Sequence, residues 1–499
     1  MQDFKIKKMK DMKNLSNYIF IAFILLISLT SCEKQLEEDV FSQLAPENFL
    51  ATEQGLESAL AGAYAEQAMN DWQGKSVLNL ESWCTDEEWE TGGGENQTAV
   101  LMIGFTFDAT LGWARDNMWN RKFAAIRNAN NVLENIDAAN VAESVKAKLK
   151  AEARFVRAVC YHYLYGWFGP VPIRTNSAEL EVARATEQEM LTFIETELTE
   201  SIPDLPNTGS EVYGRANKGA ARAFLAKFFL NSKQWQKAAD AAKSVIDMNA
   251  YSLYGNFETL FRVENDRNSE FIWVHQNIVT GGPGNYYMNG AFPPSFGSDP
   301  VTGAVHTSGM ANWAAQYRLY DEFYDSFDPT DKRRNLILNE YIHKENGSMI
   351  QLSDEANNRR SIKFVPDPAA AGNSHGNDFP EIRYADILLT RAEALNEVSG
   401  PTQEAIDLIN EVRFRANVPN IDLGDYDKNS LRDHLLDERR WEFFSERKRR
   451  EDLIRHGKFI SSAISRGKPA QSYHVRFAIP QTEIDANSLI NAEDQNDGY

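Results

Sequence analysis

Four carboxylic residues in one short stretch beside Trp83 and Trp89 could supply the acid and base groups that hydrolyse a glycosidic bond. They are Asp86, Glu87, Glu88 and Glu90. Hydrolysis needs two carboxyl groups about 5–9 Å apart, with pKa values driven apart by their surroundings. Their order in a loop establishes neither condition, and acidic loops are common in a chain with 72 Asp and Glu residues. A surface hydrolase that uses Glu88 or Asp86 is therefore only an alternative interpretation.

Other signatures of catalysis or metal binding are missing from the sequence. It has no HExxH zinc motif and no GxSxG turn, and its glycine runs at 92–94 and 281–284 lack the residues that follow in phosphate-binding loops. The histidines at 275, 306 and 375 are isolated. We predict a protein that is not an enzyme, with no catalytic residue, cofactor or metal.

Two segments have the composition of a carbohydrate-binding surface, in which sugar C–H groups stack on aromatic rings and hydroxyls bond to polar side chains. They run from Trp72 to Gly94 and from Gly281 to Trp313. The candidate ligand-binding residues are Trp83, Asp86, Trp89, Asn285, Tyr286, Tyr287, Phe292, Phe296 and Trp313. Each aromatic ring has an alternative role as a packed loop anchor, and we expect two or three of the set to contact ligand.

A leader precedes these segments and ends at Cys32. Five lysines come before an apolar run from Tyr18 to Leu29, which is too short for a permanent membrane helix. Leu29 to Cys32 resembles a lipobox, where a bacterial signal peptide is cleaved and the new N-terminal cysteine is acylated. We predict a signal peptide over residues 1–31 and a lipidated acidic tether over 32–45, with an uncleaved anchor as the alternative. Acyl chains would then hold the protein on a membrane without spanning it.

Composition excludes several kinds of partner. The chain has 52 Lys and Arg against 72 Asp and Glu, a formal net charge of −20, which argues against nucleic acid and against direct adsorption to anionic lipid. A hydrophobic content of 42% provides for a large core. A disulfide between Cys84 and Cys160 is one alternative. However, Cys160 is expected on an apolar helical face, where a buried free thiol is the commoner outcome.

The segments that must position the candidate binding residues show mainly the periodicity of helices. Residues 215–248 and 383–416 each predict two helices over 34 residues, the length of a tetratricopeptide unit, with breaks at 231–233 and 399–401. A longer pair is predicted from residue 113 to 167. The fold class is therefore mainly α, a tetratricopeptide-like scaffold with a loop-rich lobe that contains little β structure.

The lobe is predicted where glycine, proline, asparagine and aromatic residues become dense. Short β-type runs occur there at 271–274 and 361–365. Long ordered loops on a rigid scaffold are where binding residues concentrate. We predict one domain over 46–499, made of an N-terminal helical part (46–250), a loop-rich insertion (251–380) and a C-terminal helical part (381–499).

Blocks spread over the chain resemble the RagB/SusD family of outer-membrane nutrient-binding lipoproteins. They lie at 151–158, 165–172, 214–220, 381–396, 438–455 and 479–499. In the family these blocks build the scaffold and none is catalytic. The alternating charges from Glu438 onward are likewise expected to pair on a solvated or ion-paired face, so that Lys448 to Arg450 form no basic patch.

The resemblance implies a SusD-like protein that captures oligosaccharide at the cell surface and caps a SusC-like TonB-dependent outer-membrane transporter as a hinged lid. It also implies a lipid-anchored position on the outer membrane, facing the exterior. For the ligand site the resemblance implies two regions and no individual residues, because family members place an aromatic platform in loops at about these two positions. The alternatives are peptide as cargo, the surface hydrolase, and a docking scaffold for other envelope proteins.

Overall fold

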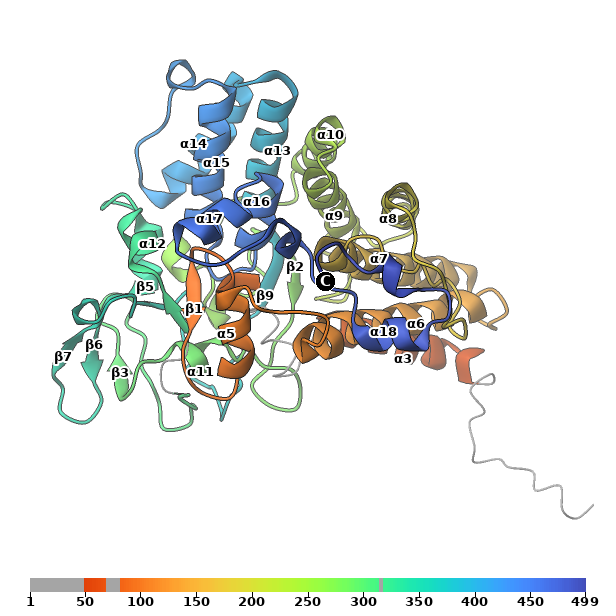
Figure 1. Ribbon diagram of the computed structural model, residues 1–499, viewed down its shortest axis with the longest axis horizontal. Helices are drawn as coiled ribbons and strands as arrows, with labels where there is room; N and C mark the ends of the chain where they lie inside the picture. Colours follow the sequence, from red (N-terminus) through yellow and green to blue (C-terminus); the bar gives the residue numbers. More distant parts are fainter. Residues whose placement is uncertain (1–48, 69–80, 314–316) are drawn as a thin grey trace, which may run out of the picture. The chain divides into compact units, whose positions relative to one another are not determined.

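The helical periodicity of the sequence is realised as a series of packed helices in the computed structural model (Figure 1). The structure describes residues 49–68, 81–313 and 317–499, so the predicted leader, Cys32 and Trp72 lie outside the described residues. Leu50–Tyr499 form one compact unit, which is described here by itself. The structure is 51% helical and 9% strand, which confirms the mainly α fold class.

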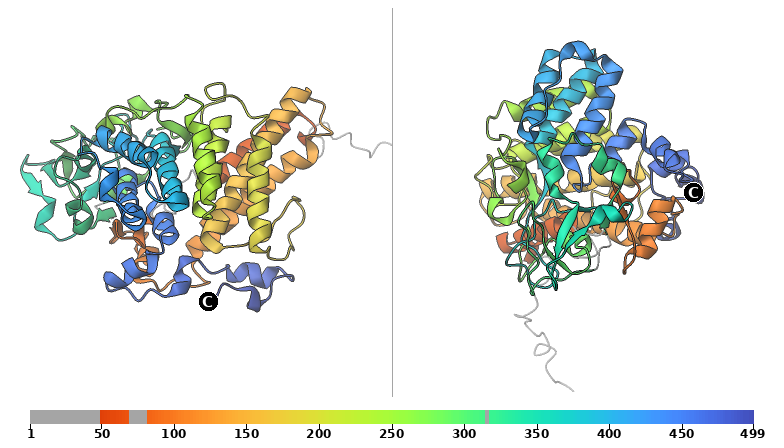
Figure 2. Two further views of the ribbon diagram at one scale, coloured as in Figure 1. Left: turned by 90° about the horizontal axis from the view of Figure 1, so that it is seen from above. Right: turned by 90° about the vertical axis from the view of Figure 1, so that its left-hand side faces the viewer.

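The N-terminal helices pack against one another mostly in chain order. They are α3 (Glu53–Ala68), α5 (Asn96–Gly104), α6 (Arg121–Asn135), α7 (Glu143–Phe168), α8 (Glu187–Ser201), α9 (Lys218–Asn231) and α10 (Trp235–Ile246). A π-helix, Ala114–Asn120, leads directly into α6. Helix α3 packs on α6, and each helix from α6 to α10 packs on the next one. Figure 2 shows this row of helices from above.

The C-terminal helices continue the same row after a long excursion of the chain. They are α13 (Tyr384–Ser399), α14 (Gln403–Ala416), α15 (Lys428–Phe443), α16 (Arg449–Arg455), α17 (Phe459–Ser465) and α18 (Gln481–Ala486). Helix α13 packs directly against α10, although residues 247–383 separate them in sequence. The two predicted helix pairs are confirmed, as α9 with α10 and α13 with α14.

Local sequence explains where these helices begin and end. The side chain of Asn217 caps α9 by accepting a hydrogen bond from the Ala220 N–H at 2.9 Å. Helix α13 stops at Gly400, whose φ of 83° suits a residue without a side chain, and Thr402 caps the start of α14.

Short antiparallel strands hold the excursion together. They are β1 (Glu88–Glu90), β2 (Phe271–His275), β3 (Phe296–Ser298), β4 (Tyr317–Leu319), β5 (Ile337–Leu338), β6 (Glu340–His343), β7 (Met349–Gln351), β8 (Arg360–Ser361) and β9 (Phe379–Arg383). The pairs are β1 with β4, β2 with β9 and β5 with β8, and β6 lies between β3 and β7. The short helices α11 (Tyr287–Ala291) and α12 (Asp321–Asp325) complete the lobe. The predicted lobe with little β structure is thus confirmed.

The predicted strand at 361–365 is wrong beyond Ser361, and a buried lysine gives the reason. Lys363 directs its ammonium group to the carbonyl oxygens of Glu442 and Phe444, each at 2.9 Å, and to the carboxylate of Glu446. The pairing with β5 ends at the Ile362 N–H, which donates to the Leu336 carbonyl at 2.9 Å, and the next residue is Lys363 with these buried acceptors. By contrast, the predicted run at 271–274 forms most of β2.

The lobe has an apolar core of its own, beside those of the helices. Phe257, Phe292, Phe296, Leu336 and Phe364 belong to it, and all are almost fully buried. A second core fills the space between α13, α14 and α15, and a third underlies the N-terminal helices. Cys84 and Cys160 are both buried free thiols.

Charged residues from Glu438 onward are paired, as predicted, but they are buried instead of solvated. Arg383 binds Glu270 and Glu446 at 2.6 and 2.8 Å, and Arg333 binds Glu438 at 2.6 Å, with every one of these side chains fully inaccessible. Arginine forks and carboxylates satisfy one another there in the absence of water. Within the described ranges, no helix combines the length and the apolar character needed to cross a bilayer.

Candidate functional site

The two predicted carbohydrate-binding segments meet in the structure. Strand β1 carries Trp89 and pairs with β4, which follows the second segment, so that Trp89 lies opposite Arg318. Tyr287 on α11 donates a hydrogen bond to Glu88 Oε2 at 3.1 Å, between residues 199 positions apart in the chain. The fold therefore brings both segments to one region of the lobe.

Trp89 is held in a defined orientation and keeps part of its surface accessible. Its indole N–H donates to the carbonyl oxygen of Asn357 at 3.0 Å. Its ring stacks on Tyr320 at a centroid distance of 6.4 Å, and the guanidinium of Arg318 lies 5.3 Å from the ring centroid. Sequence reasoning missed Arg318 and Tyr320. The alternation of Tyr317, Arg318, Leu319 and Tyr320 is a strand signal that could have found them.

Trp313 is also half-buried and fixed at both its backbone and its ring. Its backbone N–H donates to the Asn289 carbonyl at 2.8 Å, and its indole N–H donates to Asn373 Oδ1 at 3.0 Å. Asn289 in turn donates to the Asn373 carbonyl at 2.6 Å. We call Trp89 and Trp313 the tryptophan pair.

Most other candidates serve the interior of the lobe. Trp83, Phe292 and Phe296 are each 1% exposed, so none presents a ring face to solvent. Asn285 is buried and donates to the Asn377 carbonyl at 3.2 Å. Tyr287 is largely enclosed and contacts two apolar cores. Tyr286 is half-buried and directly precedes α11, so its ring keeps part of its surface accessible.

The carboxylate of Asp86 is paired with an arginine. Both of its carboxylate oxygens accept hydrogen bonds from Arg449 at 2.8 Å, and Arg440 donates to its backbone carbonyl at 2.6 Å. Burial alone would raise the pKa of Asp86, but Arg449 and Arg440 outweigh burial and hold that pKa well below its usual range. Asp86 therefore ties its loop to α16 and is not presented to a ligand.

The neighbouring glutamates are buried as neutral acids. Burial raises the pKa values of Glu87, Glu88 and Glu90 to about 8. Glu88 and Asp86 thus have pKa values shifted in opposite directions, as a hydrolase would require. However, Glu88 is 1% exposed and its carboxyl is bonded to Tyr287, so this pair does not face a substrate in the structure.

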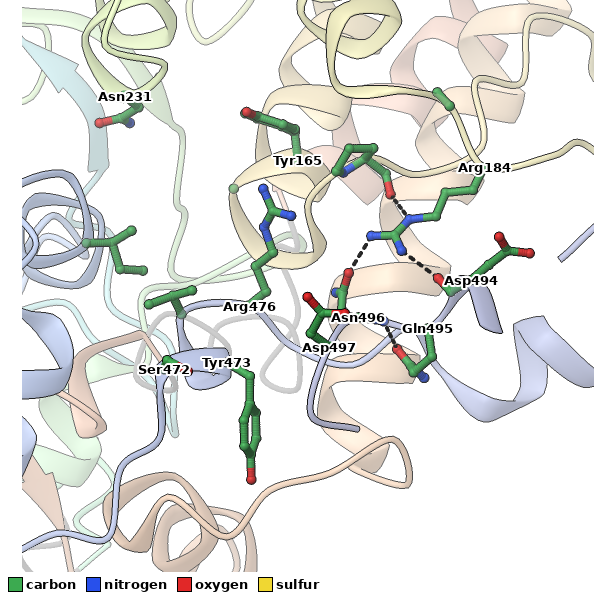
Figure 3. Close-up of a pocket in the computed structure, with 15 residues that line it drawn as sticks. Tyr165, Arg184, Asn231, Ser472, Tyr473, Arg476, Asp494, Gln495, Asn496 and Asp497 are labelled. Carbon is green, nitrogen blue, oxygen red and sulfur yellow. Dashed lines mark hydrogen bonds between the residues drawn. The ribbon is translucent and has the colours of Figure 1, made fainter. Parts of the chain in front are cut away.

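A cleft that the sequence did not predict lies where the end of α7 meets the C-terminal segment (Figure 3). Its volume is about 770 Å³, within the range of sites that bind small ligands. We call it the C-terminal cleft; its polar lining includes Tyr165, Arg184, Asn231, Ser472, Arg476 and Asp494 to Asp497.

Segments more than 300 positions apart assemble this cleft. Asn496 donates to the Phe168 carbonyl at 2.8 Å, and Arg184 donates to the Asp494 carbonyl at 2.5 Å. Arg476 passes directly over Gly169, where an added Cβ would lie 2.7 Å from the guanidinium carbon. Phe168 to Pro170 and Asn496 belong to blocks interpreted only as scaffold, Arg184 and Arg476 lie outside those blocks, and their meeting could not be inferred from the sequence.

The fold and the site define a protein with a tetratricopeptide-like helical scaffold and a loop-rich lobe that presents partly exposed aromatic rings. Residues 34–230 match the family described as "Starch-binding associating with outer membrane", and residues 339–499 match the one described as "SusD family". The chain belongs to the SusD/RagB family.

Individual relatives agree with this assignment. The chain is 28% identical to SusD-like protein P25 of Formosa agariphila, over 95% of this chain and 98% of that protein. It is 26% identical to starch-binding protein SusD of Bacteroides thetaiotaomicron, over 70% and 72% of the two chains. A solved laminarin binding SusD-like protein has the same fold, with a TM-score of 0.74 and 24% identity over 90% of this chain and all of that one.

Proposed function

We propose that this protein captures oligosaccharide at the surface of a bacterial cell, with the tryptophan pair as its stacking platform. The observation that carries the proposal is the half-buried Trp89, fixed by Asn357 and backed by Tyr320, in a family whose relatives include a starch-binding protein. A ring that is immobilised before binding loses little conformational entropy when a sugar stacks on it.

The surroundings of the tryptophan pair suit a ligand rich in hydroxyl groups. Arg318 and Asn373 stand beside the two rings and supply hydrogen-bond donors and acceptors. Sugar faces are apolar and sugar rims are polar, so this pairing of ring and polar edge fits them. The binding step needs no bond to break.

Single substitutions test the platform. We expect Trp89→Ala and Trp313→Ala each to weaken retention of the purified protein in polysaccharide affinity gels by about tenfold, the loss of one stacking contact of about 1.4 kcal/mol. Trp441→Ala is the matched control, because Trp441 is also half-buried and its indole N–H donates to Ser326 at 3.0 Å. Melting temperatures recorded on the same samples show that each variant is folded.

Two outcomes would contradict the proposal. One is unchanged retention for both tryptophan variants across a panel that includes starch and laminarin. The other is binding to a peptide pool in place of every glycan on an array, which would assign the same architecture to peptide uptake. Release of reducing ends during the assay would instead identify a hydrolase.

The anchor and the transporter complete the proposed function. Acylated Cys32 would hold the binding unit on the outer membrane, where a SusC-like TonB-dependent transporter would receive the ligand. We expect labelled fatty acid to be incorporated into the wild-type chain and not into Cys32→Ala, which should leave the membrane pellet. We also expect the transporter to co-purify with the wild-type protein; failure of both results would remove this part of the proposal.

A further inference from the structure

The C-terminal cleft contains a positive charge that no carboxylate contacts. Arg184 donates to the carbonyl oxygens of Pro170 at 2.6 Å, Asp494 at 2.5 Å and Phe168 at 3.3 Å, and to the side chain of Asn496. All four acceptors are uncharged, and no carboxylate of the described chain forms an ion pair with Arg184. The guanidinium is thereby held in place by neutral acceptors, without a carboxylate in hydrogen-bond contact.

A second arginine extends into the same space. Figure 3 shows the guanidinium groups of Arg184 and Arg476 approaching the cavity from two different segments, with Tyr165 beside them. The ion pair of Arg476 with Glu187 is long, at 3.6 Å, and both side chains are about half exposed. Burial lowers the pKa of Arg184 and the nearby charge of Arg476 lowers it further, whereas the carboxylates of Asp494, Glu187 and Asp497 act in the opposite direction.

Three carboxylates lie near the cleft, and none of them accepts a hydrogen bond from Arg184. Asp497 is exposed, and Glu187 is half-exposed and accepts a hydrogen bond from the Tyr165 hydroxyl. Asp494 is half-buried and accepts from the Asn491 N–H at 2.8 Å. Water and salt screen the charges of the exposed carboxylates, whereas Arg184 is half-buried.

We propose that the C-terminal cleft is a second binding site, which takes an acidic saccharide by pairing a sugar carboxylate with Arg184 and Arg476. Guanidinium groups match carboxylates in geometry and charge. The exposed carboxylate of Asp497 and the hydroxyl of Ser472 can bond to sugar hydroxyls, and the ring of Tyr165 offers a stacking face. The cavity volume of about 770 Å³ accommodates a short oligosaccharide.

The negative net charge of the protein determines what an acidic saccharide needs in order to bind. A chain with a formal charge of −20 repels anions at long range, so an acidic saccharide gains nothing from its overall field. Binding of such a ligand therefore requires a local cluster of cations. The site is separate from the tryptophan pair, and either proposal can fail without the other.

Calorimetric titration of the full-length chain, purified in detergent, with trigalacturonate tests the proposal. The methyl-esterified trisaccharide is the matched ligand, since it keeps the sugar and removes the charge. We expect the acid form to bind at least tenfold more tightly than the ester, and added salt to weaken it. We expect Arg476→Gln to weaken binding about tenfold or more, Arg476→Glu to weaken it further, and Arg476→Lys to restore most of it.

Controls separate a local effect from a global one. Arg115→Gln removes a surface arginine of similar exposure that pairs with Asp116, and should leave binding unchanged. Trp89→Ala and Trp313→Ala should also leave it unchanged. The proposal is overturned if trigalacturonate does not bind, if the ester binds as tightly as the acid, or if Arg476→Glu with an unaltered melting temperature binds like the wild type.

Discussion

Tryptophans six positions apart have different roles because their surroundings differ. Trp83 is 1% exposed and packs near Tyr317, with ring centroids 6.2 Å apart, inside the core of the N-terminal part. Trp89 is half-buried and bonded at its edge. Burial on this scale depends on residues more than 200 positions away, and the type of residue alone does not reveal it.

Substitution of Trp83 should therefore reduce mainly stability, and substitution of Trp89 should reduce mainly ligand binding. We expect Trp83→Ala to lower the free energy of unfolding by about 3–5 kcal/mol, because it leaves a large cavity. Trp89→Ala should cost less than about 2 kcal/mol and act mainly on ligand affinity. Urea denaturation monitored by circular dichroism measures both, and equal losses of stability would refute the distinction.

Glu88 should make stability depend on alkaline pH. Burial raises its folded pKa from about 4.5 to about 8, so the folded chain keeps a proton that the unfolded chain has lost. Its stabilising contribution is complete below about pH 4.5 and disappears as the pH rises through 8. We expect Glu88→Gln to be more stable than wild type at pH 8 by about 1–3 kcal/mol, and equal to it at pH 4.5.

Melting temperatures from pH 4.5 to 9 check this expectation. The control is Glu143→Gln, since Glu143 begins α7 with its side chain 88% exposed. A constant difference between Glu88→Gln and wild type over the whole range would show that Glu88 is ionised in the folded protein.

At the scale of elements, α16 holds the loop that carries Trp83 and Trp89. Arg449 at the start of α16 donates two hydrogen bonds of 2.8 Å to the carboxylate of Asp86. We expect Arg449→Met to destabilise the protein by about 3–5 kcal/mol, because it leaves a buried carboxylate without its partner. It should also weaken glycan retention, since the loop loses its attachment.

The double variant Asp86→Asn with Arg449→Met identifies the cause. It should recover most of the lost stability, because it removes the uncompensated charge as well. Arg115→Met, at an exposed ion pair, should cost less than about 1 kcal/mol. Additive losses from the two single changes would mean that the pair does not act as a unit.

Regular elements could be predicted because their signals are local. Apolar spacing, the break at 231–233 and Gly400 predict the bounds of α9, α10, α13 and α14 to within three residues. The end of the strand expected at 361–365 could not be predicted, because the acceptors that bind the Lys363 ammonium group lie about 80 positions away in the sequence.

The candidate site could be predicted only as a region. Dense aromatic residues identified both segments, but which rings stay accessible depends on the pairing of β1 with β4 and on the core of the lobe. The C-terminal cleft gave no sequence signal at all, because its two arginines lie 292 positions apart.

At the scale of the whole molecule, buried carboxyl groups should place maximum stability on the acid side of neutrality. Burial alone would raise the pKa of Glu442, but Arg415, Arg383 and Arg333 outweigh it and hold that pKa well below its usual range. That contribution is present above about pH 4.5 and is lost as the pH falls. Glu87, Glu88 and Glu90 act in the opposite direction as the pH rises.

We therefore expect the melting temperature to peak near pH 5 and to fall on both sides. Differential scanning fluorimetry from pH 3 to 9 at constant ionic strength measures the profile. A peak at pH 8 or above would show that the buried glutamates of the lobe contribute no net penalty on ionisation.

Because α10 packs directly on α13, the chain leaves and rejoins its helical row at neighbouring points. Residues of the intervening stretch nevertheless bind the later helices through buried ion pairs, such as those of Arg333 with Glu438 and of Lys363 with Glu446. An exchange of residues 247–383 with the matching stretch of a relative would therefore have to retain Arg333 and Lys363, and it would replace Trp313 while leaving Trp89 and the lining of the C-terminal cleft unchanged.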